Sequence, residues 1–188
     1  MEVLLLGDSL FARHEGQDEP HIQYSLHQLD SRLTFRNLAQ SGDNSFDLIK
    51  KLDQLDWQGA DKVCLWVGAN DMATHKQVFL GEYLDNIDSI YRTLLAHYAP
   101  HQILVLQLAP VDEKKQLYRT NRLAGYYNEL IQQKTAEYRV DTLDVAALFA
   151  GSELPLEELL AGSMDDGLHF GSAAYELLAD AIYSWLAS

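Results

Sequence analysis

Short apolar runs and longer amphipathic stretches alternate along the whole chain. The short runs predict five buried strands, at residues 3–6, 35–38, 63–67, 103–108 and 140–145. The longer stretches carry apolar residues every three or four positions and predict helices at about residues 24–33, 45–55, 79–97, 121–138 and 172–186. Near-continuous runs of Val, Leu and Ile are typical of parallel strands buried on both faces. The pattern therefore predicts an α/β fold, a three-layer α/β/α sandwich around a five-stranded parallel sheet.

Local signals refine some of these boundaries. Ser45 precedes an apolar stripe, so we expect it to be the N-cap of that helix. Pro100 closes the longest amphipathic helix, because proline cannot continue the helical hydrogen-bond ladder. The charged stretch at residues 111–121 is expected to be a loop.

The composition is that of one folded unit. The 188 residues are 47% hydrophobic and 22% charged, with 4 Pro and 11 Gly, which excludes collagen-like and intrinsically disordered chains. The sequence contains no internal repeat, low-complexity segment or linker. We therefore expect a single domain over residues 1–188.

The charge balance is strongly acidic. Because 14 Lys and Arg stand against 28 Asp and Glu, a net charge of −14, we expect neither nucleic acid nor an anionic membrane surface as a partner. No stretch approaches the roughly 18 apolar residues of a membrane span, so membrane insertion is not expected. Cys64 is the single cysteine, and the apolar run at residues 3–6 is too short for a secretory signal. These features predict a cytoplasmic protein and leave its oligomeric state open.

Polar residues suited to chemistry follow the predicted strands. Gly7-Asp8-Ser9-Leu10 comes after the first strand, Gly42 lies in the turn after the second, and Asn70 and Asp71 follow the third. Taken singly, each segment reads as ordinary turn or cap chemistry. In a parallel sheet, however, ligands bind at the carboxyl ends of the strands. We therefore expect these turns to meet in one cleft.

A further motif, Asp166-Gly167-Leu168-His169, precedes the last predicted helix. A carboxylate three residues before an imidazole can accept from one ring nitrogen and fix the tautomer, which leaves the other nitrogen to act as a base. His97 and His101 are also four residues apart, but Pro100 between them ends the helix, so we expect no metal site there. The chain lacks a dinucleotide Gly-x-Gly-x-x-Gly, a P-loop and a Gly-x-Ser-x-Gly elbow.

Together these motifs resemble the GDSL family of the SGNH hydrolases. The family pattern has a serine in Gly-Asp-Ser, a glycine, an asparagine in Gly-x-Asn-Asp and an Asp-x-x-His, and all four occur here in that order. The resemblance implies a flavodoxin-like SGNH hydrolase fold and an activity that needs no metal and no cofactor. It also implies an acyl-serine mechanism with Ser9 as nucleophile, His169 as base and Asp166 orienting the imidazole. The implied oxyanion hole consists of the backbone N–H groups of Ser9 and Gly42 and the side-chain amide of Asn70.

The resemblance implies hydrolysis of carboxylic esters, and we expect a small, soluble, short-acyl ester as substrate. A carbohydrate O-deacetylase, a lysophospholipase and a thioesterase stay open as alternatives, because the shared residues lie at the bond that is cut. A non-catalytic ligand-binding domain is a further alternative, since the edge of such a sheet can bind a ligand without chemistry. Asp8 and Asp71 are expected to brace their turns through backbone N–H groups.

Overall fold

Alternate residues of the central strands face two separate hydrophobic cores. The computed structural model describes residues 1–57 and 59–188. In the first strand, Val3 and Leu5 belong to one core and Leu4 and Leu6 to the other, and all four are fully buried. This double burial explains why the strand sequences lack the polar alternation of a sheet with one solvated face.

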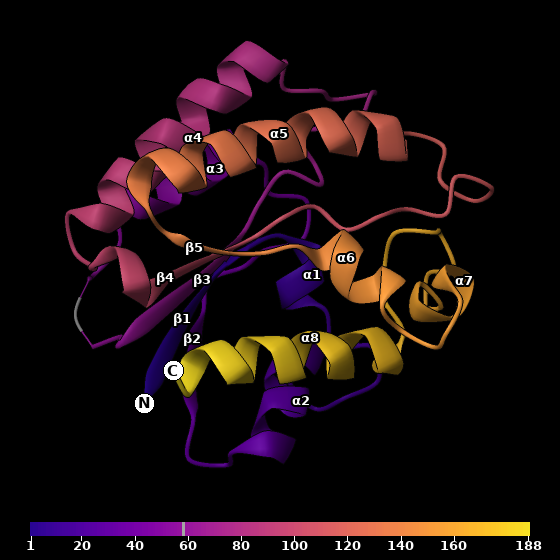
Figure 1. Cartoon of the computed structure of the whole chain (residues 1–188), viewed down its shortest axis with the longest axis horizontal. Helices are drawn as coiled ribbons and strands as arrows, with labels where there is room; N and C mark the ends of the chain where they lie inside the picture. Colours follow the sequence, from indigo (N-terminus) through magenta and orange to yellow (C-terminus); the bar gives the residue numbers. More distant parts are fainter. Residues whose placement is uncertain (58) are drawn as a thin grey trace.

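Five strands form one parallel sheet in the order β2-β1-β3-β4-β5 (Figure 1). The structure thereby confirms the predicted fold class. The bounds of the strands are Glu2–Gly7 (β1), Thr34–Asn37 (β2), Lys62–Trp66 (β3), Ile103–Leu106 (β4) and Asp141–Leu143 (β5).

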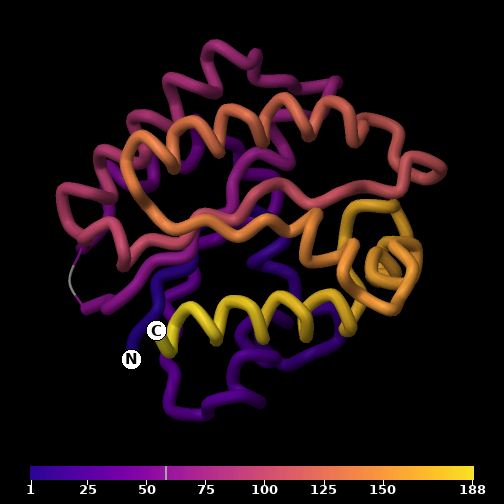
Figure 2. The backbone as a smooth tube through the Cα atoms, in the orientation of Figure 1, coloured from indigo at the N-terminus to yellow at the C-terminus, as the bar shows by residue number. Residues whose placement is uncertain are grey.

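Two layers of helices cover the sheet (Figures 1 and 2). The helices α2 (His21–Leu29) and α8 (Ser172–Leu186) pack on one face, and α3 (Ser45–Leu52), α4 (Leu80–Leu95) and α5 (Asn121–Tyr138) pack on the other. The two helices of the first layer contact each other closely although they come from opposite ends of the chain. The C-terminal helix thus completes the layer that the N-terminal segment begins.

The strand order places two turns side by side. β1 pairs with β2 on one edge and with β3 on the other, where Gly7 lies opposite Trp66. The turns that follow β1 and β3 therefore leave the sheet next to each other, at the point where the strand order reverses. A crevice at such a point is the usual ligand site of an open α/β sheet.

Several short helices of the described chain have no counterpart in the prediction. The predicted strand at residues 140–145 was too long, because Asp144 caps a helix by accepting the N–H of Ala147 at 2.9 Å. That capping interaction ends β5 after three residues. The unpredicted helices are α1 (Ser9–Ala12), α6 (Val145–Ala150), α7 (Leu156–Leu159) and the 3₁₀ helix η1 (Pro100–Gln102).

The helix predicted over residues 24–33 is displaced toward the N-terminus in the structure. It is α2, and Asp30 ends it in an extended conformation. Leu33, the last apolar position of the predicted stripe, lies after the helix and not in it. Its side chain nevertheless packs into the core. Periodicity alone could not separate a helical position from a loop position buried on the same side.

The residue that caps α3 also differs from the prediction. Asn44 is the N-cap, because its side-chain oxygen accepts the N–H groups of Phe46 at 3.0 Å and Asp47 at 3.2 Å. Ser45 is the first helical residue, and its hydroxyl donates to the buried carboxylate of Asp71. The serine therefore joins the turn after β2 to the turn after β3.

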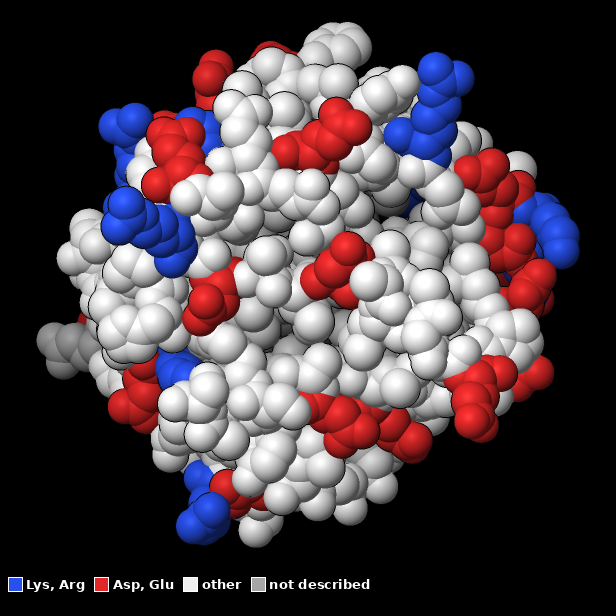
Figure 3. Space-filling model, in the orientation of Figure 1, with Lys and Arg blue, Asp and Glu red and all other residues white. Residues whose placement is uncertain are grey.

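Charge is distributed unevenly over the face drawn in Figure 3. Acidic side chains are spread across it, and basic side chains lie mainly towards its margins. This distribution agrees with the excess of 28 acidic over 14 basic residues. In the described part of the chain, no helix combines the length and the apolar character needed to cross a bilayer.

Candidate active site

The turn after β1 places Ser9 at the first position of α1. Asp8 is the N-cap, and its carboxylate accepts the N–H of Leu10 at 3.0 Å. The N–H of Ser9 is one of the first-turn amides that have no acceptor inside their own helix. Ser9 is 8% exposed. The turn therefore presents a hydroxyl and a backbone donor together at the carboxyl end of β1.

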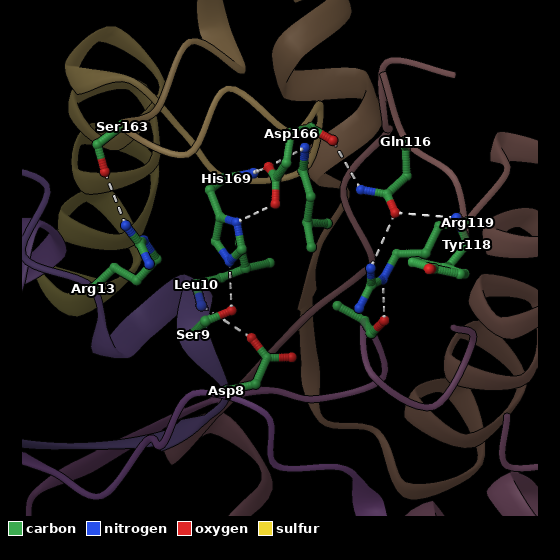
Figure 4. A network of polar contacts seen from close by, with 12 residues as sticks. Asp8, Ser9, Leu10, Arg13, Gln116, Tyr118, Arg119, Ser163, Asp166 and His169 are labelled. Atoms are coloured by element: carbon green, nitrogen blue, oxygen red, sulfur yellow. Dashed lines mark hydrogen bonds and ion pairs between the residues drawn. The ribbon is translucent and has the colours of Figure 1, made fainter. Parts of the chain in front are cut away.

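His169 and Asp166 approach Ser9 from the other end of the chain (Figure 4). Ser9 Oγ lies 2.9 Å from His169 Nε2, although 160 positions separate the two residues. On the far side of the ring, Nδ1 lies 2.8 Å from Oδ2 of Asp166. With its proton on Nδ1, the ring donates to the carboxylate, and Nε2 accepts from the hydroxyl. The three side chains form one continuous hydrogen-bonded chain.

Asp166 is held by its own turn. Its Oδ1 accepts the backbone N–H groups of Leu168 and His169, each at 3.1 Å. Partial burial acts to raise the pKa of Asp166, but these N–H groups and the charge of His169 outweigh it and lower the pKa below its ordinary value. Asp166 is therefore ionised at neutral pH and can orient the imidazole.

The turns that carry Gly42 and Asn70 are tied to each other and to β1. Asn70 Nδ2 donates to the carbonyl of Asp43 at 2.8 Å, and the N–H of Gln40 donates to the carbonyl of Gly7 at 3.2 Å. Gly42 has a φ of +94°, a conformation that glycine adopts without a steric penalty. The structure thus brings these turns to the carboxyl ends of the strands, where Ser9 also lies.

Two buried carboxyl groups brace these turns, as predicted. The two oxygens of Asp71 accept the N–H of Ser45 at 3.0 and 3.1 Å, and burial raises the pKa of Asp71. Burial also raises the pKa of Asp8 to about 7, against the N–H of Leu10, which lowers it. The carboxyl group directly beside Ser9 therefore keeps its proton to a higher pH than an ordinary aspartate does.

The loop after β4 supplies two side chains that sequence reasoning missed. Arg119 is 8% exposed, and its guanidinium donates to the carbonyl of Ala69 at 2.6 Å and to Oδ1 of Asn70 at 3.3 Å. Gln116 accepts from Arg119 at 3.2 Å and donates to the backbone carbonyl of Asp166 at 3.0 Å (Figure 4). The loop's position directly after a strand was the available signal, and no motif or spacing distinguishes these two residues.

Two ion pairs connect the loop after β4 to α7 and to the loop that carries His169. Lys115 pairs with Asp165, and Lys114 Nζ lies 3.1 Å from Oε1 of Glu157. All four side chains are substantially exposed, so each pair contributes little stability by itself. The Lys115–Asp165 pair nevertheless shows where the loop after β4 meets the loop that carries His169.

The two histidines with metal-like spacing lie in separate elements. His97 follows α4 and stacks on Trp57 with ring centroids 4.2 Å apart, whereas His101 belongs to η1. Within residues 1–57 and 59–188, no group of three or more His, Cys, Asp and Glu side chains is arranged to hold a metal ion.

Several solved structures share this fold. A lipase/acylhydrolase from Enterococcus faecalis has a TM-score of 0.82 at 20% identity, over 97% of this chain and 93% of the other. An acetylxylan esterase from Geobacillus stearothermophilus has a TM-score of 0.75 at 19% identity, over 100% and 94%. A protein described as a putative platelet activating factor from Streptococcus pneumonia has a TM-score of 0.77 at 24% identity, over 98% and 83%. At these identities the likeness establishes the fold.

Comparison at the level of sequence gives a more specific result. A search among the curated proteins finds no match. The model of the GDSL-like Lipase/Acylhydrolase family, in contrast, matches residues 5–177. This span covers most of the 188 residues and includes both Ser9 and His169. The chain therefore belongs to the GDSL-like Lipase/Acylhydrolase family.

Proposed function

We propose that this chain hydrolyses carboxylic esters through a covalent acyl-serine intermediate formed on Ser9. Membership of the acylhydrolase family supports ester hydrolysis in general. The observation that carries the serine mechanism is the hydrogen-bonded chain from Asp166 through His169 to Ser9. A serine hydroxyl is a weak nucleophile at its own pKa, and an adjacent base of this kind is what activates it.

Acylation begins when Ser9 Oγ attacks the carbonyl carbon of the ester and its proton passes to His169 Nε2. Asp166 stabilises the imidazolium that forms. His169 then returns the proton to the oxygen of the departing alcohol, and the acyl group stays on Ser9. In deacylation, water attacks the acyl carbon and gives its proton to the same nitrogen, which passes it to Ser9 Oγ as the carboxylic acid leaves.

The negative charge on the carbonyl oxygen is stabilised by three donors. They are the N–H of Ser9, the N–H of Gly42 and the side-chain amide of Asn70. An amide nitrogen carries two protons, and Asn70 directs one of them to Asp43, so one proton remains for the oxyanion. Removal of one such donor typically lowers kcat by about 10²–10³.

The substrate that fits best is a small, soluble ester with a short acyl group. Ser9, Asn70 and His169 are each 7–8% exposed, so only a small part of each residue is accessible to a substrate. The net charge of −14 opposes adsorption to anionic lipid. Two apolar side chains are nevertheless exposed on the loops that carry Gln116 and His169, since Leu117 is 82% and Met164 53% exposed. Acyl-chain preference is therefore a property to measure.

Labelling with a serine-directed fluorophosphonate tests the mechanism. The wild-type protein and the Ser31→Ala control, which changes an exposed serine in the turn before β2, should be labelled at Ser9. Ser9→Ala should not be labelled. Labelling at another serine, or no labelling of a folded wild-type protein, would contradict the nucleophile and favour a non-catalytic binding domain.

A series of aryl esters tests the substrate class. Acetyl to butyryl esters should be cleaved faster than octanoyl esters, with no increase in rate when anionic vesicles are added. The series includes an acetylated oligosaccharide, a lysophospholipid and an acyl thioester, because these represent the alternative activities. Faster cleavage of octanoyl esters that Leu117→Ser abolishes would overturn the short-acyl preference and leave the serine mechanism intact.

A further inference from the structure

Arg119 is a buried cation that donates hydrogen bonds to three acceptors near the proposed oxyanion donors. Its Nε donates to the carbonyl of Ala69 at 2.6 Å, its Nη2 to Oδ1 of Asn70 at 3.3 Å and its Nη1 to Oε1 of Gln116 at 3.2 Å. Arginine has five N–H donors in a rigid plane and no acceptor. The guanidinium can therefore tolerate only oxygen atoms at these three positions.

This requirement fixes the orientation of the Asn70 amide. Its oxygen faces Arg119, and its nitrogen faces the carbonyl of Asp43. If the amide were rotated by 180°, its NH₂ group would meet the guanidinium donors and its oxygen would meet a carbonyl. Both ends would then be repulsive, so the two contacts together leave the second amide N–H directed away from Asp43.

The same cation strengthens Asn70 as a donor. A hydrogen bond from a charged group to the amide oxygen is stronger than one between neutral groups, and hydrogen bonds in series polarise one another. Arg119 is 8% exposed, so water screens this effect little. Burial lowers the pKa of Arg119, and the nearby charges of Asp8 and Asp166 counteract that lowering.

Gln116 connects Arg119 to the loop that carries Asp166 and His169. Its Oε1 accepts from Arg119 and also from the N–H of Tyr118 at 3.3 Å, and its Nε2 donates to the backbone carbonyl of Asp166. The orientation of this amide is fixed by the same argument. One guanidinium therefore contacts both Asn70 and Gln116. Gln116 in turn contacts the backbone carbonyl of Asp166 (Figure 4).

We propose that Arg119 is a positioning residue for the oxyanion site, which holds the amide of Asn70 with an N–H directed at the reacting carbonyl oxygen and polarises that N–H. The inference rests on the proposed function, because it needs Asn70 to be an oxyanion donor. A purely structural Arg119 would anchor its loop and affect stability, but its effect on kcat would not depend on Asn70.

A double-mutant cycle separates these two roles. Kinetics with a soluble aryl acetate are measured for the wild-type protein, Asn70→Ala, Arg119→Ala and the double variant. Arg119→Ala should lower kcat by about tenfold, within the range of couplings found for side chains in contact, and leave KM within about twofold. In the Asn70→Ala background, the same change should alter kcat by less than about twofold.

Three further variants complete the experiment. Arg122→Ala removes an exposed arginine three positions along the chain and should leave kcat unchanged. Gln116→Ala should cost less than Arg119→Ala, because the contact to Asn70 survives. Arg119→Lys keeps the charge without the planar fork, and its loss of kcat should likewise disappear in the Asn70→Ala background, which keeps the test available if Arg119→Ala does not fold.

The outcomes distinguish the inference from the proposed function. Equal losses from Arg119→Ala, or from Arg119→Lys, in the presence and absence of Asn70 would overturn the positioning role while the oxyanion site stands. A loss confined to KM would overturn it as well. If Asn70→Ala itself leaves kcat unchanged, the oxyanion assignment in the proposed function fails first, and the inference fails with it.

Discussion

The turns after β1, β2 and β3 and the loop that carries His169 meet at one point but are held in different ways. The three turns continue directly from strands and are linked by buried contacts, such as Asp71 to the N–H of Ser45. The loop that carries His169 follows α7 and not a strand. It is held by its own hydrogen bonds, by Gln116 and by the exposed ion pair of Asp165 with Lys115. We call these two regions the strand turns and the closing loop.

The two regions also treat their carboxyl groups in opposite ways. In the strand turns, burial raises the pKa of Asp8 to about 7. In the closing loop, N–H groups and His169 overcome the effect of burial and lower the pKa of Asp166. Burial thus favours the neutral form of the Asp8 carboxyl group. The Asp166 carboxyl group is instead held charged, next to the imidazole that the proposed mechanism protonates.

The largest expected effect tests whether the two regions act as one catalytic unit. Ser9→Ala should lower turnover by roughly 10⁴ or more, and His169→Ala should cost about as much, because nucleophile and base work together. The double variant should be no slower than either single one. Asp166→Ala should cost less, because it orients and stabilises without making bonds.

Steady-state kinetics with urea unfolding as a control for the fold measure these effects. If Ser9→Ala retains more than a tenth of the wild-type kcat, Ser9 is not the nucleophile. Additive losses from the two single variants would show that the regions contribute independently.

The next effect concerns pH and the two carboxyl groups. The pKa of Asp8 is raised from 3.8 to about 7 in the folded state, so the folded protein binds more protons than the unfolded chain between these values and loses stability as pH rises through them. Asp8→Asn keeps an acceptor for the N–H of Leu10 and removes this loss. At about 1.4 kcal/mol per pH unit, its stability relative to wild type should increase by up to about 4 kcal/mol from pH 4 to pH 8.

For Asp166→Asn we expect the opposite pH dependence of stability. The pKa of Asp166 is lowered in the folded state, so its contribution is present above the unfolded pKa and is lost as pH falls. The variant should be less stable than wild type at pH 7 and approach it in acid. Urea unfolding at several pH values measures both differences, and parallel curves for Asp8→Asn and wild type would contradict the burial argument.

A third comparison uses one glycine from each region. Gly167 has a φ of +71°, and a Cβ there would lie 2.7 Å from the carbonyl oxygen of Asp112. Gly42 has a φ of +94° and no heavy atom within 4 Å of a Cβ. Gly167→Ala should therefore lower the free energy of unfolding by about 2–3 kcal/mol, and Gly42→Ala, which meets backbone strain alone, by about 1 kcal/mol. Equal losses in chemical denaturation would show that the closing loop relaxes around the added methyl group.

The smallest effects come from the ion pairs. Lys51 of α3 pairs with the turn after β2, where its Nζ lies 2.7 Å from Asp43 and 2.6 Å from the carbonyl of Leu38. Lys51→Ala should lower the free energy of unfolding by about 1–2 kcal/mol. Lys115→Ala removes an exposed pair and should change neither the urea midpoint nor kcat by a measurable amount in 0.5 M salt. A larger effect of Lys115→Ala than of Lys51→Ala would reverse the comparison.

Much of the fold is predictable because burial leaves a local pattern. Strands covered on both faces read as unbroken apolar runs, and the helix expected at residues 121–138 occurs with those bounds. The predictions of element boundaries failed where a local interaction competed with the apolar pattern. Leu33 is apolar because it is buried, although it is not helical, and the strand predicted at residues 140–145 yields to a cap at Asp144.

The candidate site divides in the same way. Ser9, Gly42 and Asn70 could be proposed from sequence because each follows a strand, and His169 because a carboxylate lies three residues before it. Their resemblance to a family motif supplied the roles. Arg119 and Gln116 carry no such signal, since their function depends on which oxygen atoms the folded chain places around them.

The sequence by itself therefore determined the layers of the fold, the family and the residues at the ends of the strands. These properties follow from periodicity and from short motifs, which are encoded by neighbours along the chain. The tertiary structure alone decided the orientation of the Asn70 amide, the partners of Arg119 and the opposite pKa shifts of Asp8 and Asp166. Hydrogen-bond partners and desolvation depend on groups that are distant in sequence, and they exist only once the chain has folded.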